Sequence, residues 1–352
     1  MLNGKIIMKN IIPGNRLQFA GLFRFKGHLL LIFIILISIT LKGYGQDPEF
    51  SQFYANPLYL NPAFTGTNAI PRVALNYRNQ WPKQGNTYTT YSLSYDKFIR
   101  STTGGIGFRT MYDRQLNGVI SSITASFIFS QHFNVSDRLF FSMALETGMI
   151  IKQFNTSALI FPGMIDQGTG IIDGTYPLPV ESGQKLIPDF TFGTIGQFDE
   201  VYFGLAFHHL TQPDQSIVEG DQVGRLPLKI TFHAGAKGHE FHHGLLSKPF
   251  TLSPNLVYQQ QGAYKQINGG IYVKEDWLTY GLWYRNNLSA RPNAVVAMVG
   301  YQTEKFQFGY SFDFTLSNSR AYSYGSHELS LIFFFGEFHP RLFNNTMLIP
   351  QM

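Results

Sequence analysis

The feature that most constrains the fold of this chain is an alternation of apolar and polar residues that recurs from residue 71 onward. Each stretch covers about ten residues and ends in a short cluster of Gly, Asn, Asp, Ser or Pro. In the clearest example, residues 306–314, an aromatic ring occupies every second position, and Gln307, Ser311 and Asp313 lie between the rings. A period of two places successive side chains on opposite faces, so the pattern predicts strands.

Fourteen such segments follow one another, and nothing between them is typical of a helix. They cover residues 72–80, 87–96, 104–112, 118–131, 138–152, 189–197, 200–210, 226–237, 250–260, 265–274, 277–285, 292–301, 305–316 and 326–337. Most have the length of about 9 to 11 residues that a tilted strand needs to cross a bilayer. A soluble sandwich has shorter strands, and open sheet edges cannot face lipid. The sequence therefore predicts an all-β protein, an outer-membrane antiparallel β-barrel of about 14 strands at residues 71–338.

The links between the predicted strands alternate in length. Even-numbered strands end in short turns, whereas odd-numbered strands end in longer links, among them residues 153–188, 211–225 and 317–325. Bacterial barrels have short periplasmic turns and long external loops. We therefore expect the N-terminal end of the barrel to be periplasmic; the link at residues 238–249 is the one exception to the rule.

The basic character of the chain is concentrated at its start. Residues 1–45 hold six basic residues and no acidic one, which leaves 21 basic against 22 acidic residues in the remainder. The folded part therefore lacks the electrostatic basis for binding nucleic acid. An apolar run at residues 29–41, followed by Gly43 and Gly45, predicts a signal peptide at 1–45 and a mature start at Gln46. A single membrane anchor is the alternative.

Composition argues against an enzyme. Only 14% of residues are charged, and the chain has no cysteine, which excludes disulfides, thiolate metal sites and cysteine nucleophiles. No nucleophile is paired with a base, and we expect neither a cofactor nor a metal. His239, Glu240 and His243 match the letters of H-E-x-x-H, but the glycines and proline around them disfavour the helix that such zinc sites need. A solvated turn is favoured over adventitious metal binding and over catalytic zinc.

Several stretches carry a family resemblance. Residues 46–66 read QDPEFSQFYANPLYLNPAFTG, residues 76–82 read NYRNQWP, and residues 325–331 read GSHELSL. Together with residues 256–266, these stretches resemble the PorP/SprF family of type IX secretion system membrane proteins. The likeness extends over the whole mature chain, with residues 339–352 as a C-terminal extension.

The resemblance implies a function. It implies an outer-membrane accessory protein of the type IX secretion system of Bacteroidota, a system connected with gliding motility, and localisation in the outer membrane after signal-peptide cleavage. Its implied partners are a secreted adhesin-like client with a C-terminal sorting domain, other type IX secretion components and outer-membrane lipid. The barrel architecture by itself also fits a diffusion channel or small-solute transporter, because a fold does not determine a function.

Residues 46–70 form a lead-in to the barrel that is not a strand. Two Asn-Pro pairs and Gly66 favour successive turns, since Asn bonds its own backbone and Pro fixes φ. The many aromatics predict packing at the periplasmic mouth of the barrel or inside its lumen, as a seal or as a plug or docking surface for a partner. The candidate partner or plug residues are Asp47, Phe50, Ser51, Gln52, Tyr54, Asn56, Pro57, Leu60, Asn61, Pro62 and Gly66.

Polar residues on the inward face of the predicted strands carry charges of both signs. A barrel of about 14 strands can hold such groups with water, so they predict either a polar network in the lumen or a path for a solute. The set comprises Arg78, Asp96, Arg109, Glu146, Lys152, Lys229, His233, Arg285, Asp313 and Glu328.

Overall fold

The computed structural model describes residues 46–68, 70–82, 88–136, 138–166, 168–172, 182–216, 224–242, 248–288, 293–316 and 324–336. The predicted signal peptide at 1–45 and the C-terminal extension at 339–352 lie outside these residues. Within them, no helix is long and apolar enough to cross a membrane.

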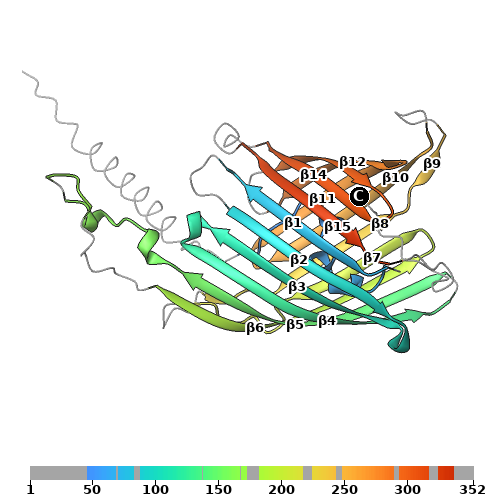
Figure 1. The fold of residues 1–352 in the computed structure, drawn as a ribbon, viewed down its shortest axis with the longest axis horizontal. Helices are drawn as coiled ribbons and strands as arrows, with labels where there is room; N and C mark the ends of the chain where they lie inside the picture. The colour runs from blue at the N-terminus through green and yellow to red at the C-terminus, as the bar shows by residue number, and fades with distance from the viewer. Residues whose placement is uncertain are drawn as a thin grey trace, which may run out of the picture. The chain divides into compact units, whose positions relative to one another are not determined.

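The strands are all antiparallel to their neighbours and form one sheet (Figure 1). Their bounds are β1 Arg72–Gln80, β2 Tyr88–Ile99, β3 Gly104–Gln115, β4 Ile120–Asn134, β5 Leu139–Phe154, β6 Gly183–Phe198, β7 Val201–His208, β8 Lys229–Ala236, β9 His239–Phe241, β10 Phe250–Gln261, β11 Tyr264–Glu275, β12 Leu278–Asn287, β13 Ala294–Gln302, β14 Phe306–Thr315 and β15 Ser326–Phe334.

The sheet closes on itself. β15 pairs with β1, and β10 pairs with both β8 and β11, so fourteen strands form a ring and the short β9 adds to β10 beside it. The predicted barrel of about 14 strands is confirmed. β9 lies in the link at 238–249, the one link that departed from the short-turn rule, and it pairs with the first residues of β10.

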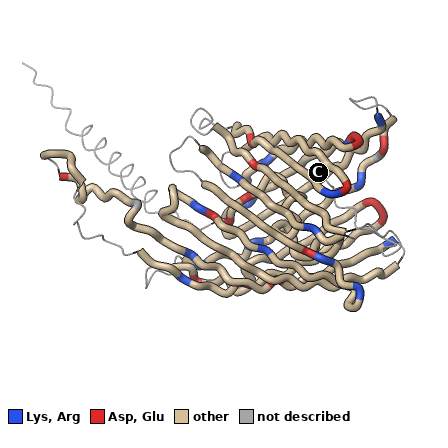
Figure 2. The backbone as a smooth tube through the Cα atoms, in the orientation of Figure 1, with Lys and Arg blue, Asp and Glu red and all other residues tan. Residues whose placement is uncertain are grey.

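The alternation in sequence sets the two faces of the wall. In β14, Phe308 is 41% exposed whereas its neighbour Gln307 is 4% exposed. Outward positions elsewhere are large and apolar, such as Phe127, Leu145 and Leu282, and the strands carry long uncharged stretches (Figure 2). An apolar outer face is what hydrocarbon requires of a barrel.

Connections differ between the two ends of the barrel, as predicted. The end where β1 begins carries short connections such as residues 199–200 and 276–277, and we name it the turn end. The opposite end, named the loop end, carries the links 155–182, 209–228 and 316–325. β6 starts at Gly183, earlier than the predicted residue 189, because it pairs with β5 as far as Phe154.

The short helices are single turns. Three precede the barrel: η1 Phe53–Ala55, α2 Pro57–Leu60 and η2 Pro62–Phe64. The others lie in connections: η3 Arg100–Thr102, η4 Leu116–Gly118, η5 Thr156–Ala158 and η6 Pro162–Met164.

Candidate functional site

Residues 46–68, which we name the lumen segment, fold as a succession of tight turns. Pro57 and Pro62 start α2 and η2, where a fixed φ and a missing N–H cost nothing. Asn61 Oδ1 accepts a hydrogen bond from the Ala63 N–H at 3.0 Å, the turn-setting bond expected from sequence. Asn56 differs from that expectation, because its side chain makes no such cap.

The lumen segment occupies the inside of the barrel. Asp47, near its start, contacts His209, Lys229 and Gln261 at the loop end, whereas the Gly66 N–H donates to Asp96 at the turn end at 2.8 Å. The segment therefore runs along the height of the lumen. Of the two expected placements, the structure has the one inside the lumen, and the placement at the periplasmic mouth is corrected. The physical reason is that the barrel wall offers polar and aromatic partners at every level.

The predicted partner or plug residues are almost all buried by this placement. Asp47 alone is half-buried; the buried ones are Phe50, Ser51, Gln52, Tyr54, Asn56, Pro57, Leu60, Asn61, Pro62 and Gly66. Side chains packed in this way contact the barrel of the same chain. They do not present a surface to a partner while the segment is in place.

Glu328 on β15 binds the backbone of the lumen segment. Its carboxylate accepts from the N–H of Ser51 at 2.7 Å and of Gln52 at 3.1 Å. The Gln52 amide in turn donates to the Glu328 carbonyl at 2.9 Å and accepts from the Ser330 hydroxyl at 2.5 Å. Hydrogen bonds to a charged acceptor are stronger than neutral ones, so this is a firm attachment.

Two arginines neutralise the carboxylates around Ser51. Arg78 bonds Glu328 at 2.9 Å and Asp313 at 2.7 Å, and Arg285 bonds Asp313 at 2.9 Å. Both guanidinium groups also donate to Ser51 Oγ at 2.7 Å. A buried ion pair roughly offsets its own desolvation, so this cluster serves chiefly to fix the segment's position.

Nearer the turn end, the wall holds the segment by its carbonyls. The Ser142 and Ser130 hydroxyls donate to the carbonyls of Ala63 and Thr65 at 2.8 and 2.7 Å. Gly105 permits this approach, since a Cβ there would lie 2.6 Å from the Thr65 carbonyl oxygen. Arg72, which is bound to Asp96, donates to the Phe64 carbonyl at 3.1 Å.

Asn61 ties the segment to a second part of the wall. Its amide Nδ2 donates to the carbonyls of Thr194 on β6 at 3.0 Å and Leu205 on β7 at 3.2 Å. Gly193 makes room for it, because a Cβ there would lie 2.2 Å from Asn61 Oδ1.

An apolar cluster fills the space between segment and wall. Phe53 packs on Trp283 with ring centroids 5.1 Å apart, and Tyr54 lies 6.0 Å from Tyr202 and 6.3 Å from Tyr272. Leu58, Leu60, Phe64, Ile195 and Val257 belong to the same buried cluster. The lumen thus holds a hydrophobic core to which the lumen segment contributes one side.

An ion-pair cluster at the loop end anchors Asp47. His209 bridges Asp47 at 2.8 Å and Asp189 at 2.9 Å, and Lys229 approaches Asp47 at 3.3 Å. Burial alone would lower the pKa of His209, but Asp47 and Asp189 raise it to about 10. Burial would raise the pKa of Asp47, yet His209 and Lys229 hold it well below its ordinary value.

Consecutive residues of a strand face opposite sides, yet His208 and His209 are both buried. β7 ends at His208, and His209 adopts a φ of 58°, which turns both rings into the buried interior. No sequence pattern indicated that His209 would meet Asp189 and Asp47. The only signal in the sequence was that Asp189 occupies an inward-facing position in the alternation of its strand.

The predicted inward polar set lies where the alternation placed it. Nine of its ten members are buried, and Lys152 is half-buried with its ammonium bonded to Gln215 at 2.6 Å. Arg109 and Glu146 form an ion pair at 2.5 Å. No pattern in the sequence indicated that several members hold the lumen segment rather than water.

The first three residues of the H-E-x-x-H match lie on a strand. β9 spans His239–Phe241 and pairs with β10, so His239 and Glu240 are not on the helix that such zinc sites need. His243 lies outside the residues that the structure describes. In the described part of the chain, no group of three metal-ligating side chains is gathered.

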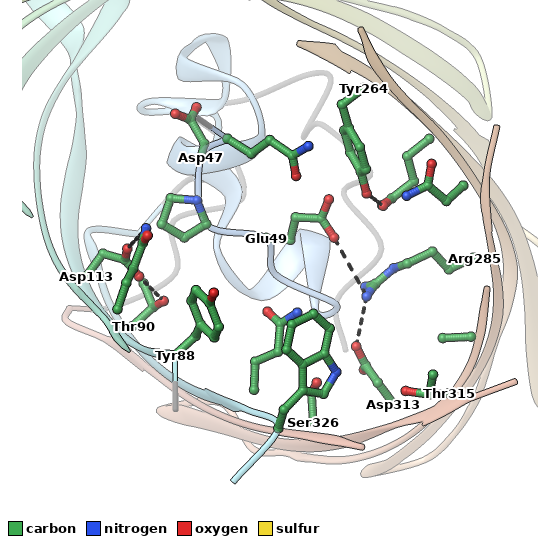
Figure 3. A pocket seen from close by; sticks show the side chains of 18 residues that line it. Asp47, Glu49, Tyr88, Thr90, Asp113, Tyr264, Arg285, Asp313, Thr315 and Ser326 are labelled. Carbon is green, nitrogen blue, oxygen red and sulfur yellow. Dashed lines mark hydrogen bonds and ion pairs between the residues drawn. The ribbon is translucent and has the colours of Figure 1, made fainter. Parts of the chain in front are cut away.

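The lumen segment does not fill the loop end of the barrel beside Asp47. A cavity of about 510 Å³ lies at the loop end, with residues 46–49 at one side and the strand ends around it (Figure 3). Ser51 and Gln52 of the lumen segment, which follow these residues in the chain, are fully buried.

These features define a class: a closed β-barrel membrane protein whose lumen is filled by its own N-terminal segment. A family model described as type IX secretion system membrane protein PorP/SprF matches residues 42–333. The chain belongs to this family, which confirms the resemblance found in its sequence.

Solved structures similar to this chain include porins. Mutants of the Rhodopseudomonas blastica porin match with 6–7% identity, 76% of this chain and 99% of theirs covered, and a TM-score of 0.34. A structure titled "Asymmetric conductivity of engineered proteins" matches at 7% identity over the same shares, with a TM-score of 0.35. Comparison with curated proteins returned no match.

Proposed function

We propose that this chain is an outer-membrane accessory protein of the type IX secretion system that assists export or surface retention of specific adhesin-like clients. Its partners would be a client with a C-terminal sorting domain, other components of the system and outer-membrane lipid. Family membership supports the secretion role, and the apolar outer face of the closed barrel supports the membrane location.

The observation that carries the proposal is the filled lumen. A diffusion channel needs a water-filled interior. Here the charged groups that could line a solute path, such as Arg78, Asp313 and Glu328, bind Ser51 and Gln52 instead. The occupied lumen therefore favours an accessory role in secretion over the alternative of a channel or small-solute transporter.

The processing and layout of the chain are part of the proposal. Residues 1–45 would be removed as a signal peptide, residues 46–70 would form the lead-in, 71–338 the barrel and 339–352 an extension. We also propose that the protein is not an enzyme and that it acts through contacts with other proteins.

The test is a deletion strain complemented with a tagged copy of the chain. Surface proteins are released by protease from intact cells and quantified, and proteins that co-purify with the tagged barrel from native membranes are identified. We expect one or a few proteins with C-terminal sorting domains to leave the surface on deletion, to return on complementation and to co-purify. An unchanged surface proteome, together with slower uptake of small solutes, would favour the channel.

A further inference from the structure

The cavity at the loop end, which we name the vestibule, adjoins the start of the lumen segment. It is lined by residues from the loop ends of β1, β2, β3 and β11 to β15, and the start of the lumen segment projects among them (Figure 3). Its volume of about 510 Å³ lies in the range of ligand pockets. Because the segment fills the lumen below, a ligand enters and leaves from the loop end.

Acidic groups outnumber basic ones on the vestibule lining. The lining holds four carboxylates, those of Asp47, Glu49, Asp113 and Asp313, and one cation, Arg285. The charge of Asp47 is neutralised by ion pairs with His209 and Lys229. The charge of Asp313 is neutralised by ion pairs with Arg78 and Arg285.

Glu49 and Asp113 are neutralised less completely than these two. Glu49 lies 3.8 Å from Arg285, which already bonds Asp313 at 2.9 Å. The carboxylate of Asp113, only 3% exposed, is held by neutral donors of the described chain, the Thr90 hydroxyl and the Gln115 amide, each at 2.7 Å. The vestibule thus carries an excess of negative charge in a partly desolvated setting, where an entering cation is attracted strongly.

Aromatic rings complete the lining. Trp81 and Tyr88 meet edge to face with centroids 5.8 Å apart, and Tyr264 stands on the other side (Figure 3). Trp81 is fixed in a strained backbone, φ 56°, by its N–H bond to the Gly325 carbonyl at 3.0 Å. Aromatic faces favour cations, and the guanidinium group of arginine most often.

We infer that the vestibule binds a lysine or arginine side chain of a polypeptide that approaches the loop end of the barrel. Amide and hydroxyl groups around the charged centre, those of Gln80 and Thr315, can bond the peptide backbone, which a free small cation would leave unused. The inference deepens the proposed function and rests on it, since it assigns the chemistry by which this barrel would recognise a client or another secretion component.

The test is calorimetric titration of the purified intact protein in detergent with three synthetic hexapeptides. One carries two arginines among Gly and Ser, one replaces them with glutamates, and one has no charge. We expect the arginine peptide to bind at least tenfold more tightly than the other two. Equal affinity for the neutral peptide, or no binding of the arginine peptide, would overturn the inference.

Variants locate the site. Glu49→Gln combined with Asp113→Asn should weaken arginine-peptide binding at least tenfold, whereas Glu200→Gln, the same change at an exposed turn-end carboxylate, should leave it unchanged. Unaltered binding in the double variant would overturn the assignment. If the double variant fails to fold, the comparison of peptides on the unmodified protein decides alone. The client measurement in cells does not depend on the peptide titration. If no peptide binds, the cell experiment still tests the secretion role, and if no client is affected, the titration still tests the vestibule.

Discussion

At the scale of single residues, the lumen segment is held by charges that meet only in the folded chain. Asp47 lies 162 residues before His209 in the sequence, and Asp189 lies 20 residues before it on the neighbouring strand. The buried position of Asp189 agrees with the alternation along β6, although the sequence analysis did not single this residue out. The turn of the backbone at His209 could not be predicted, because a positive φ in a residue other than glycine depends on the contacts that compensate its strain.

The His209 cluster predicts how the attachment of the segment depends on pH. The raised pKa of His209 means that its contribution is complete below the ordinary value of 6.5 and is lost as pH rises toward about 10. The lowered pKa of Asp47 means that its contribution is complete above 3.8 and falls only in stronger acid. Hydrogen exchange of residues 46–60 should therefore, after correction for intrinsic rates, reveal weakening attachment between pH 6.5 and 10.

The matched variant for this prediction is His209→Gln, which keeps a hydrogen-bond donor and removes the titrating charge. It should abolish the change in attachment between pH 6.5 and 10. If the unmodified and variant proteins show the same corrected profile, His209 does not carry the anchor.

The two Asn-Pro pairs should differ in importance, although the sequence makes them look alike. Asn61→Ala removes the bond to the Ala63 N–H and the bonds to Thr194 and Leu205, which should cost about 1 to 2 kcal/mol. The buried side chain of Asn56 makes no hydrogen bond to the described chain, so Asn56→Ala should cost much less. Hydrogen exchange of residues 57–66 should speed up roughly tenfold in Asn61→Ala only. Similar effects in both variants would contradict the assigned contacts.

At the scale of elements, the strands could be predicted nearly completely. The outer face of the barrel meets hydrocarbon and the inner face meets polar groups, so neighbouring residues of a strand must differ in polarity. The alternation therefore predicts both where a strand lies and which side chains face outward. Strand ends were less certain. β6 extends to Gly183 because β5 continues to Phe154, and this pairing beyond the bilayer needs no alternation in hydrophobicity.

This difference along the long strands gives a prediction. Leu145 lies near the middle of β5 and Leu186 near the loop end of β6, and both face outward with exposures of 53% and 59%. Leu145→Arg should destabilise the barrel folded in a bilayer by about 2 to 4 kcal/mol, and Leu186→Arg should destabilise it by about 0 to 1 kcal/mol. Denaturant titration in lipid vesicles measures both values. Equal costs would contradict the placement of the bilayer around the barrel.

At the scale of the whole molecule, the sequence predicted a barrel and a segment packed on it, but not the path of the segment. Aromatic content indicated burial, and the inward charges indicated a polar lumen. Neither pattern states which inward group pairs with which residue, because the partners are brought together only by the closed barrel, as Ser51 and Glu328 are across 277 residues. The consequence is a barrel that belongs to a secretion family and has its lumen occupied by its own chain.

The most direct test of this view is ion conductance through the barrel in planar bilayers. The intact chain should give no steady conductance, because residues 50–67 occupy the lumen. A chain lacking residues 46–66 should still fold, since strand pairing and the apolar outer face remain, and it should conduct because water would replace the segment around Arg78, Asp313 and Glu328. Steady, porin-like conductance of the intact chain, unchanged by the deletion, would contradict a lumen closed by the segment.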